Sequence, residues 1–154
     1  MNVDLQIASD NQPLPSQQQF EAWVELACKQ RPDADVVVRV VDESESAELN
    51  LSYRQKSGAT NVLSFPFELP EGLPADALID VCLGDLVICA QLVEQEATEQ
   101  GKSVIDHWAH LVVHGCLHLQ GYDHIEEQDA NVMEGLEIEL LANIGVTNPY
   151  EGSA

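Results

Sequence analysis

Three histidines in the last third of the sequence could bind one metal ion. His114 and His118 are four residues apart, so on a helix they lie one turn apart on the same face. Gly121 is expected to end that helix, because glycine adopts the left-handed conformation without a steric penalty. The chain can then turn and bring His124 against the other two rings. Three imidazoles without a fourth protein ligand are typical of an open zinc site, and we predict that His114, His118 and His124 bind one Zn²⁺ ion.

The spacing of these histidines equals that of the H-E-x-x-H-x-x-G-x-x-H motif of the metzincin proteases, with one difference. The residue after the first histidine is Gly115, where those proteases carry the glutamate that acts as general base. The ligand spacing is therefore kept and the base of the peptidase is missing. This pattern favours a metallohydrolase that is not a peptidase of that type. A closed structural zinc site, or a helix that binds no metal, is the alternative.

A zinc ion held by three neutral imidazoles keeps its charge and an open position for water, whose pKa then falls toward about 7. Such a site supplies hydroxide at neutral pH, or a Lewis acid for a phosphoryl or carbonyl oxygen. The ring nitrogens that do not bind metal need hydrogen-bond acceptors, and Asp123 and the backbone are candidates. His107 and His110 share the helix face with the predicted ligands and are interpreted as groups that pack beside them or orient them.

A phosphodiester substrate would also need a cation, and Arg54 is the candidate. It stands near an apolar strand, with Lys56 two residues further on. A guanidinium group binds two phosphate oxygens at once, which positions the phosphate and stabilises charge in the transition state. The alternative is an ordinary surface arginine at a helix C-terminus. The pattern of residues alone does not separate these two interpretations.

The elements that would position these residues follow from hydrophobic periodicity and from turn residues. Ser16 and Ser103 are predicted to cap the two helices that follow them. Strands come mostly first and helices last, which predicts an α+β fold with a small mixed four-stranded sheet and about five helices. The metal site is expected in a cleft at the end of the central histidine-bearing helix. The expected strands are 3–7, 35–41, 60–67 and 80–89, the expected helices are about 17–30, 46–53, 89–100, 103–120 and 126–143, and 68–77 is the expected mobile loop.

Composition limits the class of protein. A chain of 154 residues with 45% hydrophobic residues predicts a single domain, 1–154. The apolar runs are too short for a membrane helix, and the N-terminus lacks the pattern of an export signal, so we expect a cytoplasmic protein. The cysteines are interpreted as small buried hydrophobic residues in a reducing compartment; they are Cys28, Cys82, Cys89 and Cys116.

The strongly negative net charge of the chain argues against a protein that coats nucleic acid. The chain has 27 acidic residues against 6 basic ones, a formal charge of −21. Such a surface repels RNA and DNA unless its few cations are concentrated where they are needed. An enzyme with a small basic path into its site remains compatible with this charge.

The histidine motif, His114-Gly-Cys-Leu-His-Leu-Gln-Gly-Tyr-Asp-His124, resembles the signature of the bacterial YbeY endoribonucleases. The similarity covers about 3–150, and the sequence is identified as a member of this family. Three further segments resemble the family in the same way: Leu51-Ser-Tyr-Arg54, Thr60-Asn-Val-Leu-Ser-Phe-Pro-Phe67 and Gly84-Asp-Leu-Val-Ile88.

The resemblance implies a metal-dependent, single-strand-specific endoribonuclease of the bacterial cytoplasm. Such enzymes mature ribosomal RNA, notably the 3′ end of the 16S rRNA, and act in ribosome quality control. It implies that His114, His118 and His124 bind zinc, that Arg54 is catalytic, and that Arg54 and Lys56 contact RNA. The implied partners are the small ribosomal subunit, ribosomal proteins and the GTPase Era, and the implied fold is α+β with the metal in a cleft.

The chain departs from the family in its strong acidity and in Ser57-Gly58-Ala59, where a more charged or proline-containing loop is usual. These features indicate that a docking partner such as the ribosome supplies RNA affinity. Two other functions stay open: a ribosome-assembly factor with a structural zinc and little catalysis, and a metzincin-like hydrolase of another substrate. The nucleophile, either water or the RNA 2′-hydroxyl, also stays open, and the sequence identifies no general base.

Overall fold

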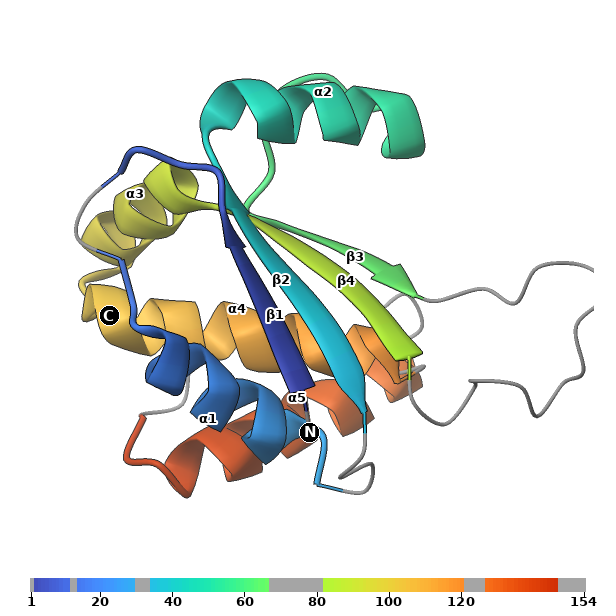
Figure 1. The fold of residues 1–154 in the computed structure, drawn as a ribbon. Helices are drawn as coiled ribbons and strands as arrows, with labels where there is room; N and C mark the ends of the chain where they lie inside the picture. The colour runs from blue at the N-terminus through green and yellow to red at the C-terminus, as the bar shows by residue number, and fades with distance from the viewer. Residues whose placement is uncertain (1, 12–13, 30–33, 67–81, 121–126, 147–154) are drawn as a thin grey trace, which may run out of the picture.

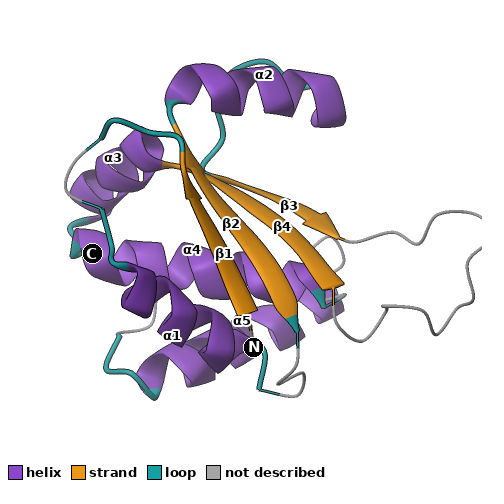
Figure 2. Cartoon of the chain, viewed as in Figure 1, coloured by secondary structure: helices purple, strands orange, loops and turns teal. Residues whose placement is uncertain are grey.

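We describe residues 2–11, 14–29, 34–66, 82–120 and 127–146 of the computed structural model (Figure 1). The order of helices and strands along these residues is the one expected from the sequence (Figure 2). The strands are β1 (Asn2–Ile7), β2 (Asp35–Val41), β3 (Val62–Pro66) and β4 (Cys82–Cys89). The helices are α1 (Gln17–Ala27), α2 (Glu43–Arg54), α3 (Ala90–Gln100), α4 (Val104–Leu119) and α5 (Glu127–Ala142). The loop predicted at 68–77 lies outside the described residues.

The four strands form one mixed sheet in the order β1-β2-β4-β3. β1, β2 and β4 are parallel, and β3 pairs antiparallel with β4 at the edge of the sheet. This mixed sheet with five helices confirms the predicted α+β fold. The edge position of β3 matters for the site, because β4 is the only strand that pairs with β3 among the residues that the structure describes.

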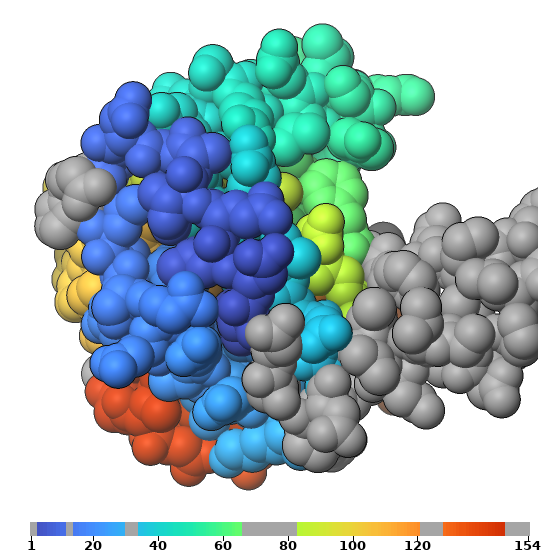
Figure 3. Space-filling model, viewed as in Figure 1, coloured from blue at the N-terminus to red at the C-terminus, as the bar shows by residue number. Residues whose placement is uncertain are grey.

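The helices cover both faces of the sheet. Because side chains alternate along a strand, Leu86 and Ile88 of β4 face one way and Val87 faces the other. The first face carries the large core with α1, α3, α4 and α5, whereas α2 packs Leu49 over a smaller cluster on the opposite face. Figure 1 shows the sheet between α2 and the helices α1, α4 and α5, whereas α3 contacts α2. The space-filling view in Figure 3 shows α2 at the same end of the molecule. The site lies where these two layers meet at the edge formed by β3.

Helix α4 is the central helix of the larger layer. Trp108 of this helix is 1% exposed and packs edge to face against Phe20 of α1, with ring centroids 5.6 Å apart. A helix buried on nearly all sides has a fixed position, so its few exposed side chains are held in place by the core. The buried residues of α4 are His107, Trp108, Ala109, Leu111, Val112, Val113, Gly115, Cys116, Leu117 and Leu119.

Local signals in the sequence explain most helix ends. Ser16 and Ser103 cap α1 and α4 as predicted, each through a side chain that accepts a backbone N–H hydrogen bond. Helix α2 begins at Glu43 rather than near Ser46, because acidic residues in its first turn suit the positive end of the helix dipole. Helix α4 ends at Leu119, and Gly121, the predicted stop, lies outside the described residues.

The remaining expectations from composition concern membranes and thiols. Among the described helices, none has both the length and the apolar character that a membrane crossing requires. Cys28, Cys89 and Cys116 are buried, as predicted, whereas the side chain of Cys82 lies outside the described part of the structure.

Candidate active site

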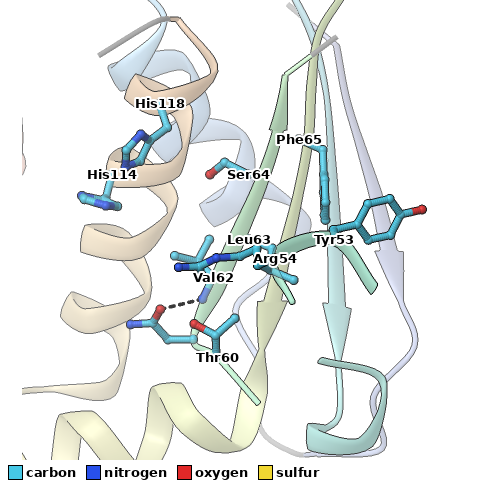
Figure 4. A pocket seen from close by; sticks show the side chains of 10 residues that line it. Tyr53, Arg54, Thr60, Val62, Leu63, Ser64, Phe65, His114 and His118 are labelled. Carbon is cyan, nitrogen blue, oxygen red and sulfur yellow. Dashed lines mark hydrogen bonds between the residues drawn. The ribbon is translucent and has the colours of Figure 1, made fainter. Parts of the chain in front are cut away.

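A cleft of about 580 Å³ lies between the end of α2, the edge strand β3 and the C-terminal half of α4 (Figure 4). It is lined by Tyr53 and Arg54 of α2, by residues 60–65, and by His114 and His118 of α4. Two predicted ligands and the predicted arginine therefore line one cleft, although they lie about 60 residues apart in sequence. The cleft lies at the end of the histidine-bearing helix, as was predicted from the sequence.

His114 and His118 occupy the face of α4 that the core does not cover. Both side chains are partly exposed, and their ring centroids are 4.8 Å apart. This separation follows from their four-residue spacing, which stacks side chains on successive turns. His124, the third predicted ligand, and Asp123 lie outside the described residues, so the place of His124 beside the other two stays a prediction.

The carboxylate of Glu137, on α5, lies directly behind His114. Its side chain is fully buried, and one oxygen accepts a hydrogen bond from Nδ1 of His114. Its other oxygen lies 3.8 Å from Nε2 of His110. A carboxylate can only accept from Nδ1–H, so the neutral His114 ring has its lone pair on Nε2. Metal-binding histidines almost always make such a bond through their second nitrogen, and this donor set therefore fits a zinc ligand at His114.

Glu137 was not predicted as a residue of the site, although the sequence carries a signal for it. Met133, Glu137, Leu140 and Leu141 recur at helical spacing and are all buried. Glu137 therefore occupies a core position of α5, where an unpaired carboxylate would be strongly unfavourable. A glutamate on the apolar face of a helix indicates a buried partner, and here the partners are His114 and His110.

A second arrangement of ligands shares His114. The ligand atoms of His110, His114 and Glu137 all lie within 4.8 Å of one another, so these three residues could themselves hold an ion. Burial lowers the pKa of His110, even though Glu137 opposes this effect, and a neutral imidazole is the form that binds metal. An ion there would lie behind His114 rather than in the cleft. Substitutions at His110 and His118 distinguish the two arrangements.

His107 belongs to a hydrogen-bonded group that connects α4 to the cleft. Its Nε2 lies 2.9 Å from Oε1 of Glu96 on α3, and the same carboxylate accepts hydrogen bonds from the side-chain amide of Asn61. Burial raises the pKa of Glu96, but the hydrogen bonds from His107 and Asn61 outweigh it and hold the pKa below its usual value. The interaction fixes the beginning of β3, and thus one wall of the cleft, against the larger helical layer.

Arg54 is the last residue of α2, and its exposed side chain lines the cleft. Gln55 adopts the left-handed conformation (φ 57°, ψ 31°) and ends the helix, with its N–H bonded to carbonyl groups of the last turn. The two interpretations of Arg54 are thus compatible, since it is at a helix C-terminus and also faces the histidine-lined cleft. Lys56 is exposed and is not among the residues that line the cleft.

Gly115 explains why α4 can lie so close to the sheet. A Cβ atom added there would come within 2.6 Å of Cδ2 of Leu86, a fully buried residue of β4. The residue after the first histidine therefore faces the sheet at Leu86 and Ser64, where a side chain has no room. A glutamate at the position of the metzincin general base would clash with this close packing.

We expect Gly115→Ala to lower the free energy of unfolding by about 1–3 kcal/mol, because the added methyl group overpacks the core at Leu86. Chemical denaturation monitored by circular dichroism measures this change. Gly135→Ala on α5 is the matched control, since a Cβ there meets nothing within 4 Å. That substitution should stabilise the protein by roughly 0.5–1 kcal/mol, as expected for glycine to alanine inside a helix. Equal effects at the two positions would contradict the close packing of α4 on β4.

Comparison with known proteins decides the family. The family model described as "Endoribonuclease YbeY" matches residues 5–145. The chain belongs to the YbeY family. A relative in Methylococcus capsulatus, named Endoribonuclease YbeY, is 56% identical over 150 residues, which is 97% of this chain and 95% of the relative. Another in Pseudomonas fluorescens, with the same name, is 55% identical over 152 residues, covering 97% and 96%.

The YbeY resemblance proposed from the histidine motif and its three companion segments is therefore confirmed across nearly the whole chain. The solution structure of a Thermotoga maritima protein is also similar, with a TM-score of 0.57 and 26% identity over 97% of this chain and 96% of that one. The two proteins are therefore similar in fold as well as in sequence.

Proposed function

We propose that this YbeY-family protein is a metal-dependent endoribonuclease that cleaves single-stranded RNA. The observation that carries the proposal is the cleft in which Arg54 faces His114 and His118. A cation that binds phosphate and histidines suited to a metal are two parts that together can catalyse phosphodiester cleavage. The name of the relatives, endoribonuclease, supports RNA as the substrate.

In the proposed mechanism Arg54 binds two oxygens of the scissile phosphate and stabilises the charge that develops on them. His114, His118 and His124 would hold one zinc ion. When bound, zinc would polarise a phosphoryl oxygen and lower the pKa of water in the cleft. Glu137 keeps the His114 ring in one orientation and one tautomer. The attacking oxygen comes either from water or from the RNA 2′-hydroxyl, and a 2′,3′-cyclic phosphate product would indicate the latter.

The proposed role is processing of ribosomal RNA, with maturation of the 16S rRNA 3′ end and ribosome quality control, in the cytoplasm. The proposed partners are the small ribosomal subunit, ribosomal proteins and the GTPase Era, and the chain is proposed to act as one domain. Family membership supports this role. The net charge of −21 supports it too, because so acidic a chain gains RNA affinity most readily by docking on a ribosome that presents the RNA.

A ribosome-assembly factor with a structural metal is the second candidate. The group of His110, His114 and Glu137 favours it, because an ion held there by the buried carboxylate of Glu137 would serve the packing of α5 on α4. A metzincin-like hydrolase is the weaker alternative, since Gly115 faces Leu86 and supplies no base.

Cleavage of an end-labelled single-stranded RNA by protein of measured zinc content tests the proposed function. We expect cutting of the single strand, little cutting of the same sequence in a duplex, loss of activity with a chelator and recovery with zinc. His114→Ala, purified identically, should lose zinc and activity together. Cutting that survives both chelation and His114→Ala would indicate a contaminating nuclease. A zinc-loaded protein that binds ribosomes without cutting RNA would favour the assembly factor.

A further inference from the structure

The cleft extends around the edge of β3 to the opposite face of the sheet. Along this strand Val62 contacts the core that contains α4, whereas Leu63 and Phe65 belong to the small cluster under α2. The cleft is lined by residues of both sets, so it continues past the strand edge from one face to the other. The histidines lie on one side of this edge. On the other side lies an aromatic pair that the catalytic proposal does not use.

The aromatic pair consists of Tyr53 and Phe65. Their rings meet edge to face, with centroids 5.0 Å apart and an interplanar angle of 68°. Tyr53 is 67% exposed, so most of its ring is available to a ligand and contributes little to the core. Phe65 is held by the small cluster and supports the tyrosine ring from one side. An exposed aromatic ring backed by a second one is a suitable surface for stacking a nucleobase.

The backbone between the two sides is polar. The N–H of Cys89 donates to the carbonyl of Asn61 over 2.9 Å, so the backbone of Asn61 faces β4. In an antiparallel pair the backbone groups of successive residues point alternately toward and away from the partner strand. The backbone groups of Val62 and Ser64 therefore point away from β4. The side chain of Asn61 already accepts the N–H of Val62. The N–H and C=O of Ser64 therefore point outward at the strand edge. A ligand that crosses this edge meets hydrogen-bonding groups, which suits a sugar-phosphate chain.

Arg54 and Tyr53 are consecutive residues, and their side chains diverge. Figure 4 shows the guanidinium group extending toward the side of the histidines and the tyrosine ring on the far side of β3. A phosphate bound to Arg54 and the base of an adjoining nucleotide can therefore be held at the same time. We propose that Tyr53, supported by Phe65, stacks one unpaired base of single-stranded RNA beside the phosphate bound by Arg54. This inference rests on the proposed function.

Stacking of a base on Tyr53 would explain single-strand specificity in physical terms. In a duplex both faces of each base are covered by its neighbours, and the paired strand blocks its edge, so a base cannot reach Tyr53 without unstacking. Stacking on an aromatic ring also tolerates every base, because each has a π face. The site would select unpaired RNA without selecting a sequence.

Binding of a labelled single-stranded 2′-O-methyl RNA to the zinc-loaded protein tests the proposal, with the oligonucleotide shown to be intact afterwards. We expect Tyr53→Ala to weaken binding roughly tenfold and Tyr53→Phe to keep it, because the ring and not the hydroxyl stacks. Leu51→Ala is the matched control, since Leu51 lies on the same helix, is 59% exposed and does not line the cleft. An abasic oligonucleotide should bind equally to wild type and Tyr53→Ala.

Salt dependence separates stacking from charge. Tyr53→Ala should lower affinity at every salt concentration and leave the slope of log affinity against log salt unchanged. Arg54→Ala should reduce that slope by about 0.7, the value for one phosphate contact on a single strand. If wild type cleaves RNA while Tyr53→Ala binds as tightly as Leu51→Ala, the stacking site is wrong and the proposed function stands. If wild type neither binds nor cleaves single-stranded RNA, both are wrong.

Discussion

Replacing Arg54 with alanine is expected to slow cleavage of single-stranded RNA by about 10²- to 10³-fold, the range found when a donor to transition-state charge is removed. The reason is that Arg54 is the arginine that lines the cleft beside His114 and His118 in the described part of the chain. Its side chain is exposed, so the substitution should leave the free energy of unfolding and the zinc content unchanged. Single-turnover cleavage measures the loss.

Two further variants make this prediction specific. Arg54→Lys keeps the charge but loses the planar fork that binds two oxygens, and it should recover only part of the rate. Arg39→Ala is the control for lost positive charge, because Arg39 pairs with Glu45 at 2.6 Å and does not line the cleft. It should cut RNA as wild type does. Equal losses in Arg39→Ala and Arg54→Ala would mean that net charge, and not a positioned guanidinium, supports cleavage.

Much of the site could be predicted from the sequence because helical geometry is local. The four-residue spacing of His114 and His118 fixes them on one face of α4, whatever the helix packs against. The periodicity of α4 also predicts its burial, and the valine-rich pattern of β2 predicts a strand. These signals lie within one segment of the chain, which is why they can be recognised without a structure.

Features that depend on packing between distant segments were not predicted. The position of β3 as the antiparallel edge strand follows from pairing with β4, which the sequence pattern does not specify. The shape of the cleft around β3 could therefore not be predicted. The sequence shows that Gly115 stands where metzincins have a glutamate. It does not show that Leu86 fills the space where a side chain at this position would lie. Glu137 lies on the buried face of α5, yet its partner His114 is 23 residues away and on another helix. Only the packing of α5 on α4 brings these two together.

Glu137→Gln is expected to weaken zinc binding by about 10- to 100-fold, as is usual when the acceptor behind a metal-binding histidine is altered. Glutamine has nearly the same shape and can still accept from Nδ1 of His114, but it lacks the negative charge that makes the ring a better donor to the metal. Competition with a chromogenic chelator measures the affinity. The control is Glu139→Gln, since Glu139 is exposed on the same helix and should have no effect on zinc binding.

Single alanine substitutions of His118 and His110 determine which arrangement of ligands holds the ion. If the ion lies in the cleft, His118→Ala should lose zinc, and His110→Ala should keep most of it, because His110 contacts the far oxygen of Glu137 and not the cleft. The opposite pattern would place the ion among His110, His114 and Glu137. Glu137 would then be a ligand itself, the cleft would be left without its metal, and the structural role of zinc in an assembly factor would become the better explanation of this site.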